Sequence, residues 1–155
     1  MKIFGNKGIG NILKIILELS MTIGVIFLIM LYFITKWLSL NFDLFIAMIY
    51  PCGISFLLLI YQYIGLFDTL KLHNPFCQEN VKRMKISMFL SFIISLLVAI
   101  ATLLTIFTYN YYSLQLQVAL SLIALLFFGV GIALYILSEL FKEATSYKEE
   151  NDLTI

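Results

Sequence analysis

The sequence predicts an all-α polytopic membrane protein with four transmembrane helices and both termini in the cytoplasm. Three observations lead to this fold class. Of the 155 residues, 62% are hydrophobic and 12% are charged, whereas a soluble domain carries about 25% charged residues. The few charged residues separate long uncharged stretches, and lysine and arginine gather beside alternate ends of these stretches. We therefore expect residues 1–155 to form a single membrane domain whose apolar surface is covered mainly by the lipid bilayer.

The spans are read from the uncharged stretches. A helix needs about 20 mainly apolar residues to cross the ~30 Å hydrocarbon layer. Leu19 to Thr35 provides 17 uncharged residues and Leu44 to Phe67 provides 24. The third stretch, Ile86 to Ser138, has 53, which as one helix would measure roughly 80 Å. It must therefore fold back at the polar and aromatic residues 109–113. The predicted spans are residues 13–35, 44–67, 86–108 and 116–138.

Lysine and arginine predict the orientation, because cytoplasmic segments of membrane proteins carry an excess of these residues. The N-terminal arm, the 68–85 loop and the C-terminal tail together hold nine of them. The first hairpin loop holds only Lys36, and the 109–115 loop holds none. Both termini and the 68–85 loop are therefore expected in the cytoplasm.

Small residues predict how the spans pack. Lipid tails are as apolar as leucine, so helices in a membrane associate through close contact at small side chains. The third span carries such residues every four positions, and we expect this row to face another helix: Ser87, Ser91, Ser95 and Ala99. The alternative is chance, because serine and alanine are common in spans. Gly129 and Gly131 offer a similar surface on the fourth span, and Pro51 predicts a kink in the second.

The residue types that carry catalysis or bind metals are scarce. The one histidine, His73, stands in the 68–85 loop, and no CxxC motif is present. Cys52 and Cys77 fall on opposite sides of the predicted membrane, so they should not pair. Glu18 follows Lys14 at the i, i+4 spacing of a helix, which predicts an interfacial ion pair. We therefore expect no catalytic residues, no metal and no cofactor, and we do not expect an enzyme.

Polar residues are concentrated in two segments that are expected in the cytoplasm, the 68–85 loop and a helical tail at 139–155. Asn74-Pro75 should end the second helix, because a residue before proline avoids the helical conformation. The basic cluster at 82–85 suits either anionic lipid headgroups or a partner protein. The acidic face of the tail is close enough in the predicted topology to pair with this cluster. The candidate partner-binding residues are Asn74, Pro75, Phe76, Glu79, Asn80, Lys82, Arg83, Glu149, Glu150, Asp152, Leu153 and Ile155.

Two motifs carry a family resemblance. Asn74-Pro75-Phe76 with the 79–83 segment, and Phe141-Lys142-Glu143 with the 148–155 segment, are similar to the bacterial "domain of unknown function 2975" family, as is the four-span plan. The chain departs from the family's pattern at Ala144, where glycine is expected, and at Tyr147, where leucine is expected. The resemblance implies a bacterial cell-membrane protein without an established activity. Its members are often encoded beside a small helix-turn-helix regulator, which implies a soluble DNA-binding partner.

The leading interpretation is a cytoplasm-facing regulatory or sensing protein that sits in the lipid bilayer and binds such a regulator through the 68–85 loop and the tail. The chain itself has no helix-turn-helix and no basic stripe, so direct nucleic-acid binding is not expected. The alternative is a small transporter or an immunity-type protein against membrane-active peptides. Assembly into a homo-oligomer is left open.

Overall fold

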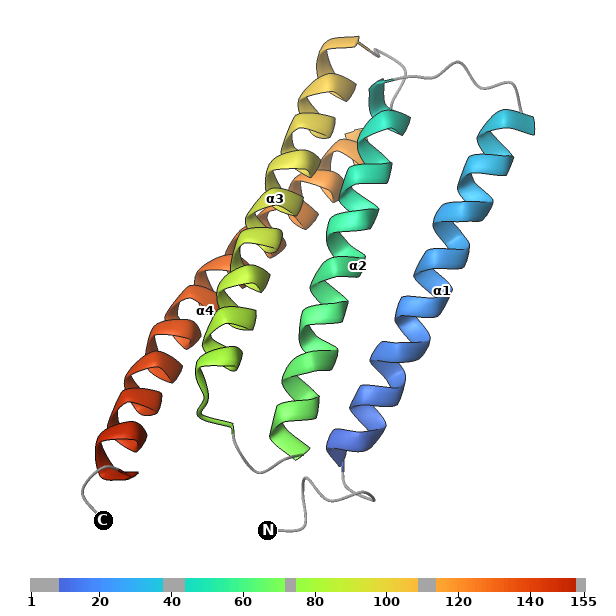
Figure 1. Cartoon of the computed structure of the whole chain (residues 1–155). Coiled ribbons are helices and arrows are strands. Elements are labelled where there is room, and N and C mark those ends of the chain that lie inside the picture. The colour runs from blue at the N-terminus through green and yellow to red at the C-terminus, as the bar shows by residue number, and fades with distance from the viewer. Residues whose placement is uncertain (1–8, 38–43, 72–74, 109–113, 153–155) are drawn as a thin grey trace.

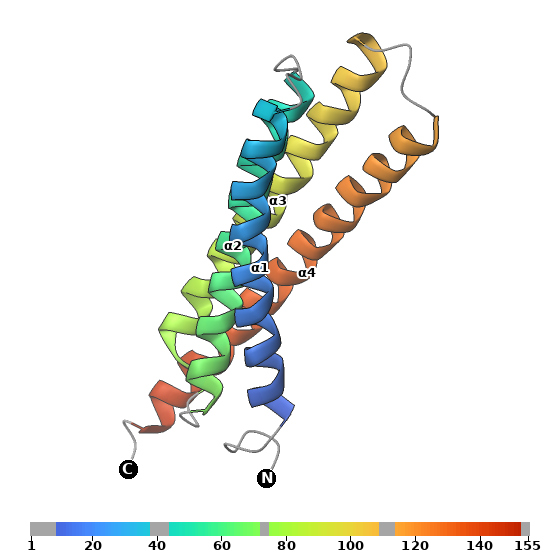
Figure 2. The same ribbon diagram turned by 90° about the vertical axis from the view of Figure 1, so that its right-hand side faces the viewer.

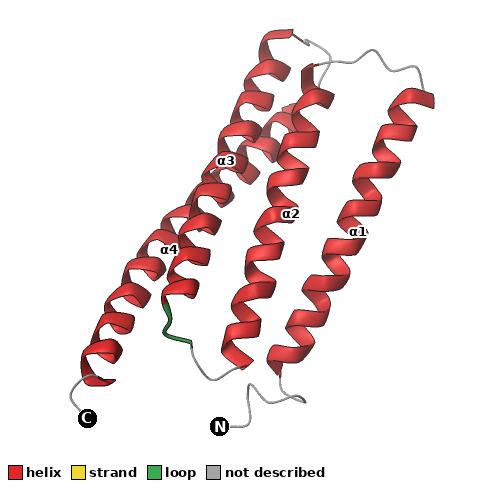
Figure 3. Cartoon of the chain, viewed as in Figure 1, coloured by secondary structure: helices red, strands yellow, loops and turns green. Residues whose placement is uncertain are grey.

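The computed structural model describes residues 9–37, 44–71, 75–108 and 114–152. They form four helices, α1 (Ile9–Trp37), α2 (Leu44–Lys71), α3 (Gln78–Thr108) and α4 (Leu114–Asp152), with no strand in this part of the chain (Figure 3). Each helix is long and apolar enough to cross a membrane. The prediction of an all-α protein with four helices of membrane-spanning length is thus confirmed, while the side on which the termini lie stays a prediction.

The helices run beyond the predicted spans. Within the predicted 68–85 loop, α2 continues to Lys71 and α3 begins at Gln78, so most of that loop is helical. The sequence predicts a loop at these charged residues, but lysine, arginine and glutamate are good helix formers. Charged residues therefore end the apolar span without ending the helix, and the described residues 75–77 before α3 are not helical. Likewise, α2 passes through Pro51 without losing its helical assignment.

The backbones approach one another in chain order, α1 with α2, α2 with α3 and α3 with α4. The N-terminal end of α1, the α2–α3 turn and the C-terminal end of α4 lie at the same end of the molecule (Figure 1). The outermost helix, α1, lies beside α2, and α4 crosses α3 obliquely (Figures 1 and 2). We name the end that holds the α2–α3 turn the turn end, comprising residues 66–71, 75–85 and 138–152.

Small and hydroxyl-bearing side chains form much of the buried face of α3, beside apolar residues such as Ile94. Ser87 and Ser91 are fully buried, and Ser95 donates a hydrogen bond of 2.8 Å to a backbone oxygen of α4. Ala99 is half-buried and packs beside the core cluster. Steps of four residues rotate by about 40° each on a helix of 3.6 residues per turn, so the row moves gradually around α3. Thr105, about five full turns after Ser87, is fully buried on the same face.

Glycines let neighbouring helices approach closely at each interface. A Cβ added at Gly131 of α4 would lie 2.7 Å from the ring of Phe92 on α3, whereas one added at Gly129 would meet nothing within 4 Å. Between α1 and α2 the arrangement is reciprocal: Leu57 of α2 lies over Gly24 of α1, and Leu28 of α1 lies over Gly53 of α2, each 2.7 Å from the added Cβ. Of the two α4 glycines that the sequence suggested, only Gly131 therefore serves as a contact.

Candidate functional site

The turn end is built on the break between α2 and α3. The backbone oxygen of Cys77 accepts hydrogen bonds from the amides of Asn80 at 3.1 Å and Val81 at 3.4 Å. These bonds start α3, and Glu79 in its first turn places a carboxylate beside the positive end of the helix dipole. The predicted site residue Asn74 lies outside the described residues. The backbone therefore places Glu79, Asn80, Lys82 and Arg83 in the first two turns of α3, with Glu79 and Arg83 on one face at the i, i+4 spacing.

Asn80 is turned inward and is 1% exposed. Its amide nitrogen donates to the backbone oxygen of Pro75 at 2.8 Å. Its amide oxygen lies 2.6 Å from the hydroxyl of Thr69, which also lies 2.8 Å from the backbone oxygen of Leu66, and the two acceptors share the single hydroxyl proton. Asn80 thus joins α2, the turn and α3. Its side chain has no surface for a partner, and this corrects its assignment as a partner-binding residue.

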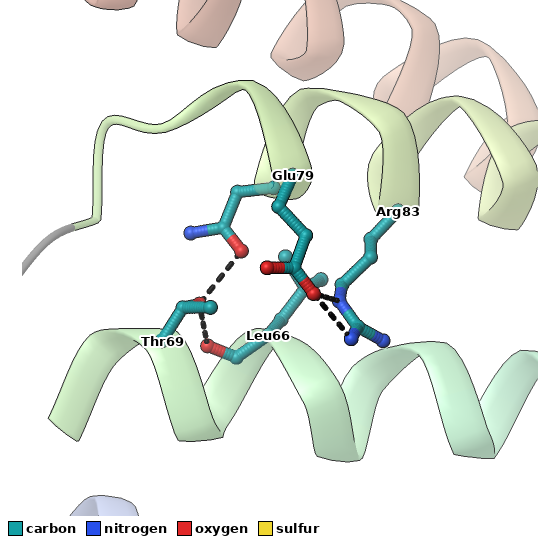
Figure 4. A network of polar contacts seen from close by, with 5 residues as sticks. Leu66, Thr69, Glu79 and Arg83 are labelled. Atoms are coloured by element: carbon teal, nitrogen blue, oxygen red, sulfur yellow. Dashed lines mark hydrogen bonds and ion pairs between the residues drawn. The ribbon is translucent and has the colours of Figure 1, made fainter. Parts of the chain in front are cut away.

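Arg83 is committed largely to intramolecular contacts. Its Nε and Nη2 atoms donate to Glu79 Oε1 at 3.2 and 2.6 Å (Figure 4). The guanidinium lies directly against Gly65 of α2, where an added Cβ would be 2.0 Å from Nη1. The arginine side chain is 23% exposed and that of Glu79 is 59% exposed. Glu79 is therefore the more accessible member of this pair.

Side-chain contacts join the tail to the turn and to the beginning of α3 among the described residues. The rings of Phe76 in the turn and Phe141 on α4 pack with their centroids 5.4 Å apart. Gln78 donates to Glu149 Oε1 at 3.2 Å. Lys85 Nζ forms an ion pair with Glu139 Oε1 at 3.4 Å. Two pieces that lie far apart in the sequence therefore form one continuous surface.

The remaining predicted site residues differ in exposure. Phe76, Glu79, Lys82, Glu149 and Glu150 are exposed, while Pro75 and Arg83 are half-buried. Leu153 and Ile155 lie outside the described residues, as does the side chain of Asp152. The accessible part of the candidate surface thus contains one aromatic ring and charged side chains of both signs.

An ion-pair cluster joins α1 to α2 at the same end of the molecule. Lys14 lies 3.5 Å from Glu18 Oε1, the pair suggested by their spacing. It also forms a hydrogen-bonded ion pair with Asp68 of α2, a contact that the sequence did not predict. The sequence is compatible with this contact, because the predicted topology places Lys14 and Asp68 on the same side of the membrane. The contact fixes the start of α1 to the end of α2.

A second feature, which the sequence did not reveal, is an apolar cleft of about 620 Å³ bounded by all four helices. Its walls include Phe27 of α1, Phe56 of α2, Val98 of α3 and Ile123 of α4. Ser20 and Cys52 are the lining residues whose side chains carry a hydroxyl or a thiol, and none of the lining residues is charged. Within the described parts of the chain, no group of three or more histidine, cysteine, aspartate or glutamate side chains is arranged to hold a metal.

Residues 14–155 match the protein family described as "Protein of unknown function (DUF2975)". The match spans nearly the whole chain and confirms the resemblance carried by the two motifs. No curated protein matches the sequence, and no solved structure matches the fold. The family description names no activity, so a function must be argued from the geometry of the turn end and the cleft.

Proposed function

This chain belongs to the DUF2975 family, and from that premise we propose that it is a membrane-anchored regulatory protein that binds a soluble partner at the turn end. One observation carries the proposal. The turn and the tail are joined by the Phe76–Phe141 packing, the Gln78–Glu149 hydrogen bond and the Lys85–Glu139 ion pair. A surface that is already assembled binds without the cost of ordering flexible segments.

The length of α4 supports a surface outside the hydrocarbon. Its 39 residues measure roughly 58 Å, whereas about 20 residues cross the bilayer. The last 14 residues, 139–152, carry five acidic and two basic side chains, which are costly to place in hydrocarbon. This part of α4 therefore extends into the aqueous phase, where a soluble partner can reach it.

The charge of the tail indicates which kind of partner it would bind. Glu143, Glu149 and Glu150 are exposed along the tail, and an excess of acidic groups attracts proteins with basic surfaces. The family resemblance points to a small helix-turn-helix regulator, and such a protein needs a basic surface to bind DNA phosphates. We infer that the tail contacts this basic surface and so competes with DNA. The proposal assigns no catalytic role to the chain.

The proposal places the turn end in the cytoplasm of a bacterial cell. It rests on the distribution of lysine and arginine, with nine on the turn-end side of the spans and one, Lys36, on the opposite side. A cytoplasmic regulator reaches the turn end only in this orientation, so capture of the partner tests orientation and binding together.

The test is a crosslinking pull-down from native membranes, with an N-terminal tag so that Ile155 remains free. Wild type is expected to capture a small helix-turn-helix protein. Removal of residues 148–155 should abolish capture without preventing membrane insertion, because it removes the exposed acids at 149 and 150. The double variant Glu149→Gln/Glu150→Gln should weaken capture in a salt-dependent manner.

The matched control is Glu18→Gln, which neutralises an acid on α1 that lies outside the proposed surface. Capture that survives the 148–155 deletion would show that the tail is not the docking site. A wild-type bait that recovers no soluble partner would overturn the regulatory proposal.

The alternative, a transporter or an immunity-type protein, concerns the interior of the four helices. A transporter of polar solutes needs a polar path, whereas the lining of the cleft is apolar except for Ser20 and Cys52. This observation favours the immunity-type version of the alternative. Loss of tolerance to membrane-active peptides on gene deletion, without a change in transcription, would support it over the regulatory proposal.

A further inference from the structure

We propose that the apolar cleft is a binding site for one acyl chain of a membrane lipid. The cleft lies between residues 20–28 of α1, 48–57 of α2, 94–101 of α3 and 120–127 of α4. These ranges lie inside the four candidate spans and toward the end of the molecule opposite the turn end. The molecules adjacent to the opening in a bilayer are therefore lipid tails, from the leaflet opposite the turn end.

The cleft is open on one side because, among the described helices, the backbone of α1 approaches only that of α2. The backbones of α1 and α4 do not approach each other, although both helices contribute to the lining. Phe27 on α1 is 60% exposed and Ile123 on α4 is 40% exposed. On the inner side, Val98 on α3 is buried and belongs to the core cluster. A ligand can therefore enter sideways between α1 and α4 and rest against α2 and α3.

The volume of the cleft limits which molecule can occupy it. A transmembrane helix about 11 Å wide displaces roughly 2,000 Å³ over four turns, far more than the 620 Å³ of the cleft. If a methylene group takes about the same ~30 Å³ as a water molecule in the liquid, the cleft holds about 20 of them. This corresponds to one acyl chain and excludes the full insertion of a helix from a partner or from a second copy.

The chemistry of the lining agrees with this occupant. A buried water needs two to four polar partners, and the cleft offers the Ser20 hydroxyl and the Cys52 thiol. An empty cleft would leave its lining side chains without dispersion contacts on one side. An acyl chain restores these contacts and requires no polar partner, whereas a peptide would bring backbone groups that the lining cannot satisfy. Occupancy would also fix the position of α1 relative to α4.

Native mass spectrometry of the full chain tests the site. The protein is reconstituted in vesicles of phosphatidylethanolamine and phosphatidylglycerol and released in mild detergent, without any soluble partner. Wild type is expected to retain one lipid per chain. Ser20→Phe and Ile123→Trp, which add bulk to the cleft from opposite walls, should each reduce retention several-fold. Both positions are exposed, so the added side chains displace the ligand rather than the packing.

The matched controls are Thr22→Phe on α1 and Leu126→Trp on α4, two exposed positions outside the lining. Both should retain lipid like wild type, and circular dichroism should show the same helix content in all variants. Equal lipid retention in the control variants and in Ser20→Phe and Ile123→Trp would overturn the proposal. So would a wild-type protein that retains no lipid, or one that shows the mass of a dimer in place of the lipid adduct. The readout does not involve a partner, so its failure is independent of the proposed function.

Discussion

The α3–α4 and α1–α2 interfaces differ in what holds them together. Along α3 the buried face includes Ser87, Ser91 and Thr105, each fully buried, and Ser95 reaches across to a backbone oxygen of α4. Along α1, large apolar side chains such as Ile23 and Phe33 remain 64% exposed. The α1–α2 contact includes two leucine–glycine pairs and one ion-pair cluster.

The difference shows that apolarity does not decide burial in a bilayer. The span of α1 is more apolar than that of α2, yet less of it is buried inside the protein. Lipid satisfies an apolar side chain as well as a neighbouring helix does, so close packing and interhelical hydrogen bonds select the partners. The helices α2, α3 and α4 consequently form one packed unit, and α1 contacts this unit through α2. Three predictions test contacts between the helices, in order of decreasing expected effect.

The largest effect is expected for Gly131→Ala in the α3–α4 interface. Its Cβ would lie 2.7 Å from the ring of Phe92, and overpacking of this kind costs about 1–3 kcal/mol. Thermal unfolding in detergent micelles should show a lower midpoint for this variant. Gly129→Ala is the control, because nothing lies within 4 Å of its added Cβ and alanine favours a helix by up to about 1 kcal/mol. Equal midpoints for the two variants would contradict the assigned interface.

A smaller effect is expected for Asn80→Ala, which removes the link between α2, the turn and α3. The Pro75 carbonyl loses its hydrogen bond, while the Thr69 hydroxyl retains the Leu66 oxygen. An unsatisfied buried group costs about 1–3 kcal/mol, and we expect the lower half of that range. Limited proteolysis should cut the turn faster than in wild type. Glu79→Ala, which removes an exposed carboxylate but keeps both Asn80 side-chain hydrogen bonds, should resist proteolysis like wild type, and similar cutting in both variants would argue against the Asn80 clamp.

The smallest effect is expected for Asp68→Asn, which removes the contact of Lys14 with α2 and leaves its pair with Glu18. The carboxylate of Asp68 is 48% exposed, and a partly exposed ion pair contributes about 0.2–1 kcal/mol. Hydrogen exchange should become faster in the first turns of α1 and stay unchanged in α3 and α4. A fall in the unfolding midpoint of the whole protein would show that α1 is integrated more tightly than the comparison implies.

The fold was largely predictable because helix number depends on local properties. Span length, the charged residues between spans and the polar break near residue 110 are all visible in the sequence. The ends of the helices were not predictable in the same way. Charged residues mark the edge of the apolar span, but Lys82 and Arg83 lie within α3. In the predicted packing row, Ser87, Ser91 and Ser95 are buried and Ala99 is half-buried, because the rotation per residue moves a four-residue repeat around the helix.

The candidate site was predictable only as a region. Sequence placed the 68–85 segment and the tail at one face of the membrane, and the contacts between Phe76 and Phe141 and between Gln78 and Glu149 join them. It did not separate exposed Glu79 from buried Asn80, because adjacent helix positions point in directions about 100° apart. Neither the Lys14–Asp68 pair nor the cleft could be read from any single segment, as each depends on helices that are distant in sequence.

By itself, then, the sequence determined that the chain is helical, how many helices are long and apolar enough to span, and where its polar groups collect. These properties follow from hydrophobic length and charge along one segment at a time. The tertiary structure decided which glycines are contacts, that Asn80 is a clamp rather than a binding residue, and that a cleft remains beside α1. These depend on which side chains meet across helices, and in lipid that choice is made by shape and hydrogen bonding rather than by apolarity.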